Sequence, residues 1–567
     1  MLENLAIISF TYDMESKETI RPNRNQPTPT VPYSVQFREL AEARRFSYVA
    51  YLYISLVVPY LIWRSTIVNW HVWYGPVALL ADIYGIITTS LFVIITRRVW
   101  EPVHRPTSFN RNVDILIPTY NEPLEVVEST AIGAINVRGR RDVLLLDDGN
   151  RPEFRQMAKR LSIYYYPRTT NEHAKAGNMN NGLVHTDAEL IMTLDADHVP
   201  LPHFLERTLG YFDDPKVGFV QTPQSFYNQD SFLFRKRRHG KWSEQGMFYD
   251  CIQPSKNRWN SAFFVGTSAV LRRSALDSVG GFATGTATED IHTSLRLHAH
   301  GWKSVFVPEA LAYGLESENL KEFYKQRRRW AAGSLGLLFR SPDSPLRARG
   351  LSVAQRANYI AACLAHLQGV QKLLYFIIPI ACIFTLTGPV TLNLAVFNLV
   401  FVGYLALALS VTNLYSRGTY HFLYTEAYNL ANMMAHFGGI KGIIKVQRKF
   451  AVSNKVAIRR ERTWLKKILW IMVGASVLGL ARVVELDLAG NFSALVVSSM
   501  VFIDVNFLAL IAFLIHLNQY EAGEVDKPNL IAPINRYRHV HETFYAPIPE
   551  IALKHTPPTL RKQRVSA

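Results

Sequence analysis

The stretch that decides the fold is Val113-Asp114-Ile115-Leu116-Ile117-Pro118, an apolar run of strand length that ends at a turn signal. Two more runs of this kind follow it, at 142–146 and 189–194. Segments with helical periodicity lie between the runs, at 123–137 and 152–162. The order strand, helix, strand, helix, strand predicts an α/β domain whose largely parallel sheet is covered on both faces.

Polar residues follow each of the three predicted strands. They are Thr119-Tyr120-Asn121-Glu122 after the first, Asp147-Asp148-Gly149 after the second and Asp195-Ala196-Asp197 after the third. Parallel sheets bind ligands beyond the carboxyl ends of their strands. We therefore expect these three segments to meet in one crevice.

Apolar blocks flank this region on both sides. Of the 567 residues, 49% are hydrophobic and only 19% are charged, and the apolar excess is concentrated in blocks. A helix needs about 20 apolar residues to cross the hydrocarbon layer of a membrane. Segments that approach this length lie at 48–68 and 74–95 before the α/β domain, and at 373–390, 394–414, 467–484 and 495–517 after it.

The distribution of positive charge predicts the orientation. Lysine and arginine cluster before the first apolar segment, after the second, and between the fourth and fifth. Because positively charged loops stay in the cytosol, the α/β domain and both termini are expected on the cytosolic side of the inner (plasma) membrane. The formal charge of +17 does not indicate nucleic acid, since the basic runs lie beside apolar segments, where lipid headgroups and a nucleotide diphosphate explain them.

Two further segments, 352–374 and 420–446, mix polar side chains with aliphatic ones. Helices of this kind lie at the membrane surface. Packing between the α/β domain and the membrane helices explains the same composition equally well.

Asp195, Asp197 and His198 are the candidate metal ligands. A divalent hard cation held by carboxylates is the usual means of neutralising a nucleotide diphosphate. An Asp-x-Asp sequence alone often marks only a solvated turn, but here it follows a buried strand. The sequence therefore favours a Mg²⁺ (or Mn²⁺) site at these residues.

Asp290, in Thr288-Glu289-Asp290, is the candidate general base. Transfer of a sugar to a hydroxyl group needs a base that takes the proton of the acceptor. Glu289 and Asp290 also suit the first turn of a helix, since acidic residues favour that position. The two interpretations are compatible, because a carboxylate at a helix start is held firmly.

Cationic and aromatic side chains complete the candidate site. Lys175 is placed to contact phosphate, and Gly177, two residues later, is expected to let a ligand approach the backbone closely. The arginines of Gln326-Arg327-Arg328-Arg329-Trp330 suit pyrophosphate, and Trp330 offers a flat face for a sugar ring. For Arg327 and Arg328, a basic helix at the bilayer surface is an equally good explanation.

The region from 113 to 330 resembles the catalytic subunits of bacterial cellulose synthases, which are processive, inverting family-2 glycosyltransferases. The resemblance rests on Pro118-Thr119-Tyr120-Asn121-Glu122-Pro123, Asn171-Glu172-His173-Ala174-Lys175-Ala176-Gly177-Asn178, Asp195-Ala196-Asp197-His198-Val199-Pro200 and Gln221-Thr222-Pro223. It continues through the membrane helices to about residue 517. It implies a GT-A-like domain that adds glucose from UDP-glucose to the non-reducing end of a β-glucan and passes the polymer across the membrane.

The resemblance also implies roles for individual residues. Asp290 would be the catalytic base, and Asp195 and Asp197 would bind Mg²⁺. A gating loop that closes over the donor would contain Phe450, Val452, Ser453 and Lys455. Donor binding would fall to Thr119, Tyr120, Glu122, Asp148, Lys175, Asp195 and Arg329, and acceptor binding to Gln326, Trp330 and Glu289.

Two departures from the family pattern leave the product open. The family has Phe-Phe-Cys-Gly where this chain has Phe263-Phe264-Val265-Gly266, and this chain has the arginine-rich sequence Gln326-Arg327-Arg328-Arg329-Trp330. The linkage can therefore be cellulose-like β-1,4, curdlan-type β-1,3 or mixed. A chitin-, hyaluronan- or alginate-type synthase that uses another nucleotide sugar is the alternative, and accessory export or regulatory subunits are possible partners.

The expected organisation follows from these patterns. It comprises a cytosolic N-terminal segment (1–46), two membrane helices (47–98), the glycosyltransferase domain (110–345), an interface helix with two membrane helices (351–414), a cytosolic interface helix with the gating loop (415–465), two more membrane helices (466–517) and a cytosolic tail (518–567).

Overall fold

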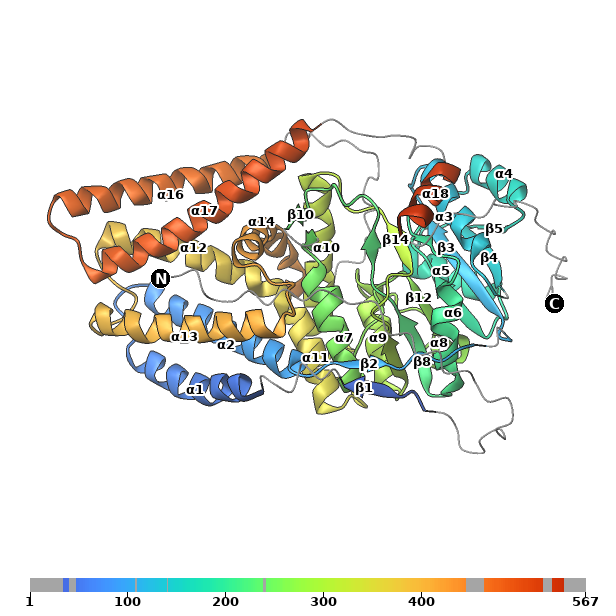
Figure 1. Ribbon diagram of the computed structural model, residues 1–567, viewed down its shortest axis with the longest axis horizontal. Coiled ribbons are helices and arrows are strands. Elements are labelled where there is room, and N and C mark those ends of the chain that lie inside the picture. The colour runs from blue at the N-terminus through green and yellow to red at the C-terminus, as the bar shows by residue number, and fades with distance from the viewer. Residues whose placement is uncertain are drawn as a thin grey trace.

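The computed structural model describes residues 34–39, 47–107, 110–139, 141–237, 241–444, 463–523 and 533–544. The molecule is elongated, with long helices at one end and an α/β domain at the other (Figure 1). Helices α10 (Leu320–Phe339) and α11 (Val353–Leu364) lie between the two ends.

The α/β domain is built on a seven-stranded sheet with the order β13-β8-β12-β6-β3-β4-β5. Strands β5, β4, β3 and β6 run parallel to one another, β13 runs parallel to β8, and β12 is antiparallel to both of its neighbours. The strands span Val113–Thr119 (β3), Arg141–Asp147 (β4), Tyr164–Pro167 (β5), Leu190–Thr193 (β6), Val217–Gln221 (β8), Ala269–Arg272 (β12) and Lys303–Phe306 (β13).

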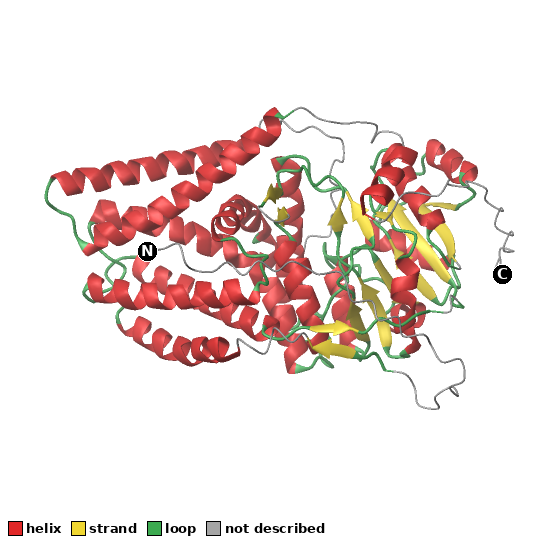
Figure 2. Cartoon of the chain, in the orientation of Figure 1, coloured by secondary structure: helices red, strands yellow, loops and turns green. Residues whose placement is uncertain are grey.

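Apolar side chains on both faces of this sheet are buried. Ile115 and Leu145 belong to the core that includes α3 (Leu124–Asn136) and α4 (Pro152–Arg160), whereas Leu116 and Leu146 belong to the core that includes α5 (Ala174–Val184). Neighbouring residues of one strand point to opposite faces, so continuous apolar runs are needed where both faces are covered. The predicted α/β class and the largely parallel sheet are confirmed (Figure 2).

Short elements complete the domain. Helices α8 (Arg273–Ser278) and α9 (Glu289–Ala299) lie in it, and α9 begins at the Thr-Glu-Asp sequence. Three small sheets pair β1 (Phe37–Glu39) with β2 (Trp100–Pro102), β10 (Phe234–Lys236) with β11 (Lys241–Ser243), and β7 (Val199–Pro200) and β9 (Ser225–Phe226) with β14 (Ala312–Gly314). The remaining turns are α6 (Phe204–Thr208), η2 (Leu209–Asp213), η3 (Met247–Ile252), α7 (Gln253–Lys256) and η4 (Asn257–Trp259).

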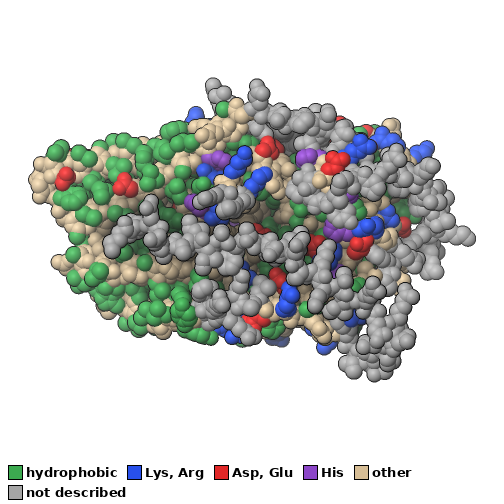
Figure 3. Space-filling view, in the orientation of Figure 1, with side chains coloured by type: hydrophobic (Ala, Val, Ile, Leu, Met, Phe, Trp, Pro, Cys, Tyr) green, Lys and Arg blue, Asp and Glu red, His purple; other side chains and the backbone are tan. Residues whose placement is uncertain are grey.

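The described residues contain six helical segments that are long and apolar enough to cross a membrane. The surface of these helices is mostly apolar, whereas the opposite end of the molecule carries charged side chains (Figure 3). Because a bilayer is the solvent that such a surface requires, the predicted membrane segments flanking the α/β domain are confirmed. They comprise α1 (Ser47–Thr66), α2 (Tyr74–Thr96), α11 continued through η5 (Ala365–Leu367) by α12 (Gln368–Thr385), α13 (Leu394–Tyr415), α16 (Trp464–Leu488) and α17 (Ala494–Ala522).

The third predicted segment is displaced. We expected it at 373–390, but α12 begins at Gln368 and ends at Thr385. Leu386 adopts a left-handed conformation with φ of 53°, and Gly388 and Pro389 follow it. A left-handed residue ends a helix, so the apolar residues after Leu386 leave the helix, and Val390 pairs with Val68 in an antiparallel bridge.

The second mixed segment packs inside the molecule. Helix α14 (Phe422–Gly439) contacts α10 on one side and α12 and α17 on the other, and α15 (Lys441–Ile444) also contacts α10. Over the described part of 420–446 the structure therefore supports the packing alternative, because α14 lies between the α/β domain and the membrane helices.

The C-terminal segment contributes to the core of the α/β domain. Helix α18 (Pro533–Phe544) packs on α3, and Tyr537 and Val540 are buried among the apolar residues of that core. The description of 518–567 as a tail is thus incomplete, since α17 extends to Ala522 and α18 returns to the domain. The other domain limits stay predictions.

Candidate active site

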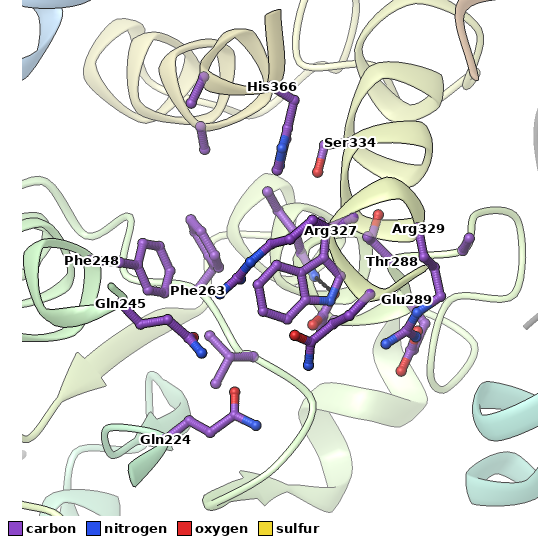
Figure 4. Close-up of a pocket in the computed structure, with 18 of the residues that line it drawn as sticks. Gln224, Gln245, Phe248, Phe263, Thr288, Glu289, Arg327, Arg329, Ser334 and His366 are labelled. Carbon is purple, nitrogen blue, oxygen red and sulfur yellow. Dashed lines mark hydrogen bonds between the residues drawn. The ribbon is translucent and has the colours of Figure 1, made fainter. Parts of the chain in front are cut away.

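A cavity of about 580 Å³ lies beyond the carboxyl ends of the central strands and continues between the membrane helices. Asp148, Asp195 and Asp290, which come from three distant parts of the chain, all line it. Figure 4 shows Gln224, Gln245, Phe248 and Phe263 on one side, Thr288, Glu289 and Arg329 on the other, Arg327 between the two groups, and Ser334 and His366 at the end nearer the membrane helices. The three strand ends therefore meet in one crevice, as expected.

The loop after β3 holds its own polar side chains in place. The Glu122 carboxylate accepts hydrogen bonds of 2.8 Å from the Thr119 hydroxyl and from the Tyr120 backbone N–H. Arg151 donates to Thr119 Oγ1 (3.0 Å) and to the Glu122 carbonyl oxygen (2.9 Å). All three predicted donor-binding residues of this loop line the cavity, and Glu122 there orients the other two.

The two neighbouring aspartates after β4 have different environments. Asp147 is fully buried and accepts hydrogen bonds from Gly149, Arg151 and Tyr165, so it fixes the turn. Asp148 lines the cavity and is held by Arg168 through two hydrogen bonds of 2.6 and 2.7 Å. Burial raises the pKa of Asp148, and Arg168 partly opposes that rise. Asp148 is the member of the pair available to a ligand.

Asp195, Asp197 and His198 follow β6 and offer ligand atoms that all lie within 4.8 Å of one another. Asp197 Oδ2 accepts a hydrogen bond from the Leu315 N–H (3.2 Å), and Asp197 Oδ1 lies 3.2 Å from His198 Nδ1. The Asp195 backbone N–H donates to Thr267 (2.9 Å). Residues from separate segments thus fix the three candidate metal ligands.

The donor set suits a divalent cation. Two carboxylates with one imidazole match the preference of Mg²⁺ and Mn²⁺ for oxygen, and Mn²⁺ also accepts nitrogen. His198 is buried, and its Nε2 has no hydrogen-bond partner among the described residues. A Cβ at Gly314 would lie 2.2 Å from the His198 ring, so glycine is required beside the imidazole.

Lys175, at the start of α5, reaches the same carboxylates. Its ammonium group forms an ion pair with Asp195, donates to the Gly266 carbonyl oxygen (2.9 Å) and lies 3.8 Å from Glu289. Burial lowers the pKa of Lys175, but the surrounding carboxylates outweigh it and raise the pKa above its usual value. Lys175 is therefore a permanent cation inside an acidic cavity. Gly177, expected to admit a ligand, lies instead against the Glu172 carbonyl oxygen.

Asp290 occupies the first turn of α9, as the helix-start interpretation predicted. Its carboxylate accepts a hydrogen bond from the Ile291 N–H (2.8 Å) and lies near Gly266 and Lys175. Burial, followed by the charge of Glu289, raises the pKa of Asp290 to about 7. A carboxyl group with a pKa near neutrality is suited to proton transfer.

Helix α10 places the remaining predicted side chains. Gln326, Arg329 and Trp330 line the cavity, and the charge of Arg329 acts on Asp290. Glu289, predicted to bind the acceptor, is buried beside Asp290 and also lines the cavity.

For Arg327 the bilayer-surface alternative is wrong. Its side chain is buried, forms an ion pair with Glu244 and lies 4.3 Å from the Trp330 ring centroid. The helical spacing of Leu320, Phe323, Arg327, Ala331 and Ser334, all of them buried, was the signal that could have placed it. Arg328, in contrast, is exposed.

Several cavity residues were not predicted. Lys256 is buried and its ammonium group lies 3.9 Å from the Phe263 ring centroid. Burial lowers the pKa of Lys256 to about 7. No sequence pattern distinguished this lysine, because only the tertiary fold places it against the cavity. Nearer the membrane helices the wall carries several polar side chains among apolar ones, and the polar ones are Asn358, His366, Gln368, Gln371, Asn429, Asn432 and His436.

The predicted gating residues Phe450, Val452, Ser453 and Lys455 lie outside the described residues, so their placement stays a prediction.

Comparisons with known proteins agree with the geometry. Residues 190–411 match the family model described as "Glycosyl transferase family group 2". The chain is 39% identical over 342 residues to "Cellulose synthase 1" of Komagataeibacter xylinus, a match that covers 57% of this chain and 22% of that protein. It is 38% identical over 360 residues to "Cellulose synthase catalytic subunit [UDP-forming]" of Pseudomonas fluorescens (strain SBW25), covering 59% of this chain and 48% of that one. The chain thus spans less than half the length of these two relatives.

Among solved structures, a mannosyltransferase from Pyrobaculum calidifontis in complex with GDP-Man and Mn²⁺ aligns with 64% of this chain and 97% of its own, with a TM-score of 0.45 and 18% identity. The family-model match includes the segments that carry Asp195, Asp197 and Asp290. The chain therefore carries a family-2 glycosyltransferase domain and resembles the catalytic subunits of bacterial cellulose synthases.

Proposed function

We propose that this protein is a processive, inverting membrane glycosyltransferase that transfers glucose from UDP-glucose to the non-reducing end of a β-glucan and moves the polymer across the membrane. The observation that carries the proposal is the single cavity of about 580 Å³. Asp195 and Asp197, the base and the cationic side chains line it at the α/β domain, and polar side chains line it between the membrane helices.

The donor half of the cavity suits a nucleotide sugar. Thr119, Tyr120, Glu122 and Asp148 surround the place where a nucleoside would lie beyond β3 and β4. Lys175 and Arg329 would neutralise its diphosphate, and Asp195, Asp197 and His198 would hold the divalent cation (Mg²⁺ or Mn²⁺) that shields the same charge.

The reaction requires a base on the acceptor side. Asp290 takes the proton of the acceptor hydroxyl as the hydroxyl oxygen bonds to the anomeric carbon. The bond from that carbon to the diphosphate oxygen breaks on the opposite face, and UDP leaves with the bonding electrons. Attack from the face opposite the leaving group inverts the anomeric centre, which yields a β linkage from an α-linked donor.

The acceptor half of the cavity suits a sugar chain. Trp330 offers an aromatic face, while Gln326 and Glu289 offer hydrogen-bond partners for hydroxyl groups. The polar wall between the membrane helices continues this surface, which fits a neutral, hydroxyl-rich polymer. We infer that Phe450, Val452, Ser453 and Lys455 close over the donor, with the α/β domain on the cytosolic side of the inner membrane.

Donor and linkage are tested with purified protein in lipid vesicles. UDP-glucose is supplied with Mg²⁺, in competition with UDP-N-acetylglucosamine, UDP-glucuronic acid or GDP-mannuronic acid, and the product is digested with linkage-specific glucanases. The proposal predicts a product that only β-glucanases degrade, and the susceptible enzyme reports β-1,4, β-1,3 or mixed linkage. A polymer built from another of these sugars would support the chitin-, hyaluronan- or alginate-type alternative instead.

A further inference from the structure

A second cavity, which we call the outer cavity, lies among the membrane helices and has a volume of about 90 Å³. It is lined by residues of α1, α2, α12, α13 and α17, and it shares α2 and α12 with the main cavity, which reaches these two helices from the α/β domain. The hydroxyl of Tyr74, at one end of α2, lies 2.7 Å from the hydroxyl of Thr385, at one end of α12. The ends of these helices that lie away from the α/β domain therefore meet (Figure 1).

The two cavities follow each other along both helices. On α2, the main cavity is lined by residues that lie between Tyr84 and Thr96, and the outer cavity is lined by Ala78 and Asp82. On α12, Gln368 and Gln371 line the main cavity, and the outer cavity is lined from Tyr375 to Cys382. The outer cavity thus continues the main cavity toward the far ends of the helices.

A hydrogen-bonded group of four side chains, here called the seal, lies where one cavity ends and the other begins. Gln371 donates to the Ala81 carbonyl oxygen (2.9 Å) and to the Tyr375 hydroxyl (3.4 Å). Tyr375 donates to Asp82 Oδ1 (3.1 Å). Asp82 Oδ2 in turn accepts from Arg64 Nε (2.8 Å). A Cβ at Gly85 would lie 2.6 Å from the Gln371 amide nitrogen, so glycine is needed for this close contact.

The seal contains an ion pair at membrane depth. Only 1% of the Arg64 side chain and 7% of the Asp82 side chain is exposed. Ionisable residues inside a membrane are costly, and they mark pathways for polar substrates. Arg64 Nη1 has no hydrogen-bond partner among the described residues, although Arg64 lines the outer cavity. The pair therefore keeps a donor available to a polar molecule in that cavity.

We propose that the outer cavity is the closed outer part of the exit path for the saccharide, and that sugar hydroxyl groups displace Tyr375 and Gln371 from Asp82 when the polymer passes. The inference rests on the proposed function, because it takes the polymer as the molecule that opens the path. Asp82 and Arg64 then bind sugar hydroxyl groups, while Tyr375 moves toward the aromatic rings of the outer cavity.

The size of the outer cavity requires this movement. A volume of about 90 Å³ is smaller than the cavity of about 150 Å³ that holds one benzene molecule in another protein, so it is too small for a hexose unit. Tyr375 already contacts Phe502, with 6.1 Å between ring centroids, and Phe397 and Phe401 line the same space. An aromatic wall beside polar groups is suited to a sugar, which has apolar ring faces and polar edges. In the absence of polymer, the same four residues prevent leakage of ions.

The seal is tested without any donor. Purified protein is reconstituted into sealed vesicles loaded with K⁺, and K⁺ release is compared for the parent protein, Tyr375→Ala and a control, Tyr48→Ala, whose tyrosine is 68% exposed on the outside of α1. We expect release at least tenfold faster for Tyr375→Ala than for the control. Thermal unfolding is used to check that both variants are folded. Equal K⁺ release from the two folded variants would overturn the proposed seal.

The path is tested by filling the outer cavity. Ser498 lines it and donates to the Ala494 carbonyl oxygen (2.9 Å), whereas Ser410 is exposed on α13 and donates to the Ala406 carbonyl oxygen (2.7 Å). We expect Ser498→Phe to shorten the polymer at least fivefold and Ser410→Phe to leave its length unchanged. Full-length polymer from Ser498→Phe would exclude this path.

Failure of the proposed function gives a different result. If the parent protein made no polymer from UDP-glucose, the transferase proposal would fail, whereas K⁺ release from Tyr375→Ala would still report on the seal.

Discussion

Asp290 differs from the other acidic residues of the cavity in the environment of its carboxyl group. It is enclosed by protein and lies next to the charge of Glu289, and together these raise its pKa to about 7. Lys175 and Arg329 oppose the rise without cancelling it. A base must be unprotonated to act, and burial places its protonation in the physiological range.

This environment predicts a pH dependence. Below about pH 7 Asp290 is protonated and cannot accept the acceptor proton, so kcat/KM should fall about tenfold per pH unit. Above that pH the rate should be level until another group titrates. Initial rates of UDP release across the pH range measure this. Because the charge of Glu289 raises the pKa of Asp290, Glu289→Gln should shift the fall to lower pH. A rate independent of pH in the parent protein would contradict the assignment.

The sequence identified most residues of the candidate site, but not their partners. The acidic residues follow apolar runs, and that pattern alone predicted that Asp148 and Asp195 meet. The ion pairs of Asp148 with Arg168 and of Asp195 with Lys175 join residues 20 positions apart, and no local pattern encodes them. Lys256 was missed for the same reason, since its burial depends on Phe263 and on the membrane helices.

At the scale of elements, α10 connects the candidate active-site cavity to the membrane helices. Arg327 on this helix pairs with Glu244, which also accepts a hydrogen bond from Asn432 of α14 (3.1 Å). Both side chains of the ion pair are largely buried, with 7% and 14% exposed. The pair thus joins three segments at the wall of the cavity.

Removal of one member of the Arg327–Glu244 ion pair should lower the stability of the protein. Glu244→Ala would leave the Arg327 charge buried without its counter-ion, which costs about 3–5 kcal/mol. The exposed pair of Arg138 and Glu206 is a suitable control, because such pairs contribute about 0–1 kcal/mol. Thermal unfolding in detergent should show a much larger decrease in Tm for Glu244→Ala than for Glu206→Ala. Equal decreases in Tm would show that the buried ion pair contributes no more to stability than the exposed one.

The sequence predicted elements where one pattern dominates. Strands β3, β4 and β6 were predicted because apolar runs flanked by turns are distinct, and the membrane helices because of their length. Strand β5 and helix α5 were missed between the second and third predicted strands, since Tyr164-Tyr165-Tyr166 and the small residues of α5 give no clear periodicity. The role of α18 could not be predicted, because it depends on contact with α3, about 400 residues earlier.

At the scale of the whole molecule, carboxylates from one end and polar residues from the other share a single cavity. The candidate cation site lies at the end nearer the sheet, where Asp195, Asp197 and His198 converge. A metal ion at this position would hold the diphosphate of the donor in the same cavity as Asp290.

Removal of the metal should therefore abolish turnover. With excess chelator, UDP release should fall at least about a hundredfold, because an uncompensated diphosphate is a poor leaving group. Added Mg²⁺ or Mn²⁺ should restore it in the parent protein but not in Asp195→Ala. Direct titration of Mn²⁺, followed by its spin resonance, should show weaker binding to that variant. Full activity in chelator would rule out the metal site.

The central claim is that one buried carboxylate at this cavity drives transfer of a sugar into a polymer. It is tested most directly by measuring UDP release and incorporation of labelled glucose together, for the parent protein and for Asp290→Asn in the same vesicles. The account predicts one UDP per glucose incorporated by the parent protein, and a loss of about 100- to 10,000-fold in the variant. Near-normal incorporation by Asp290→Asn would contradict it.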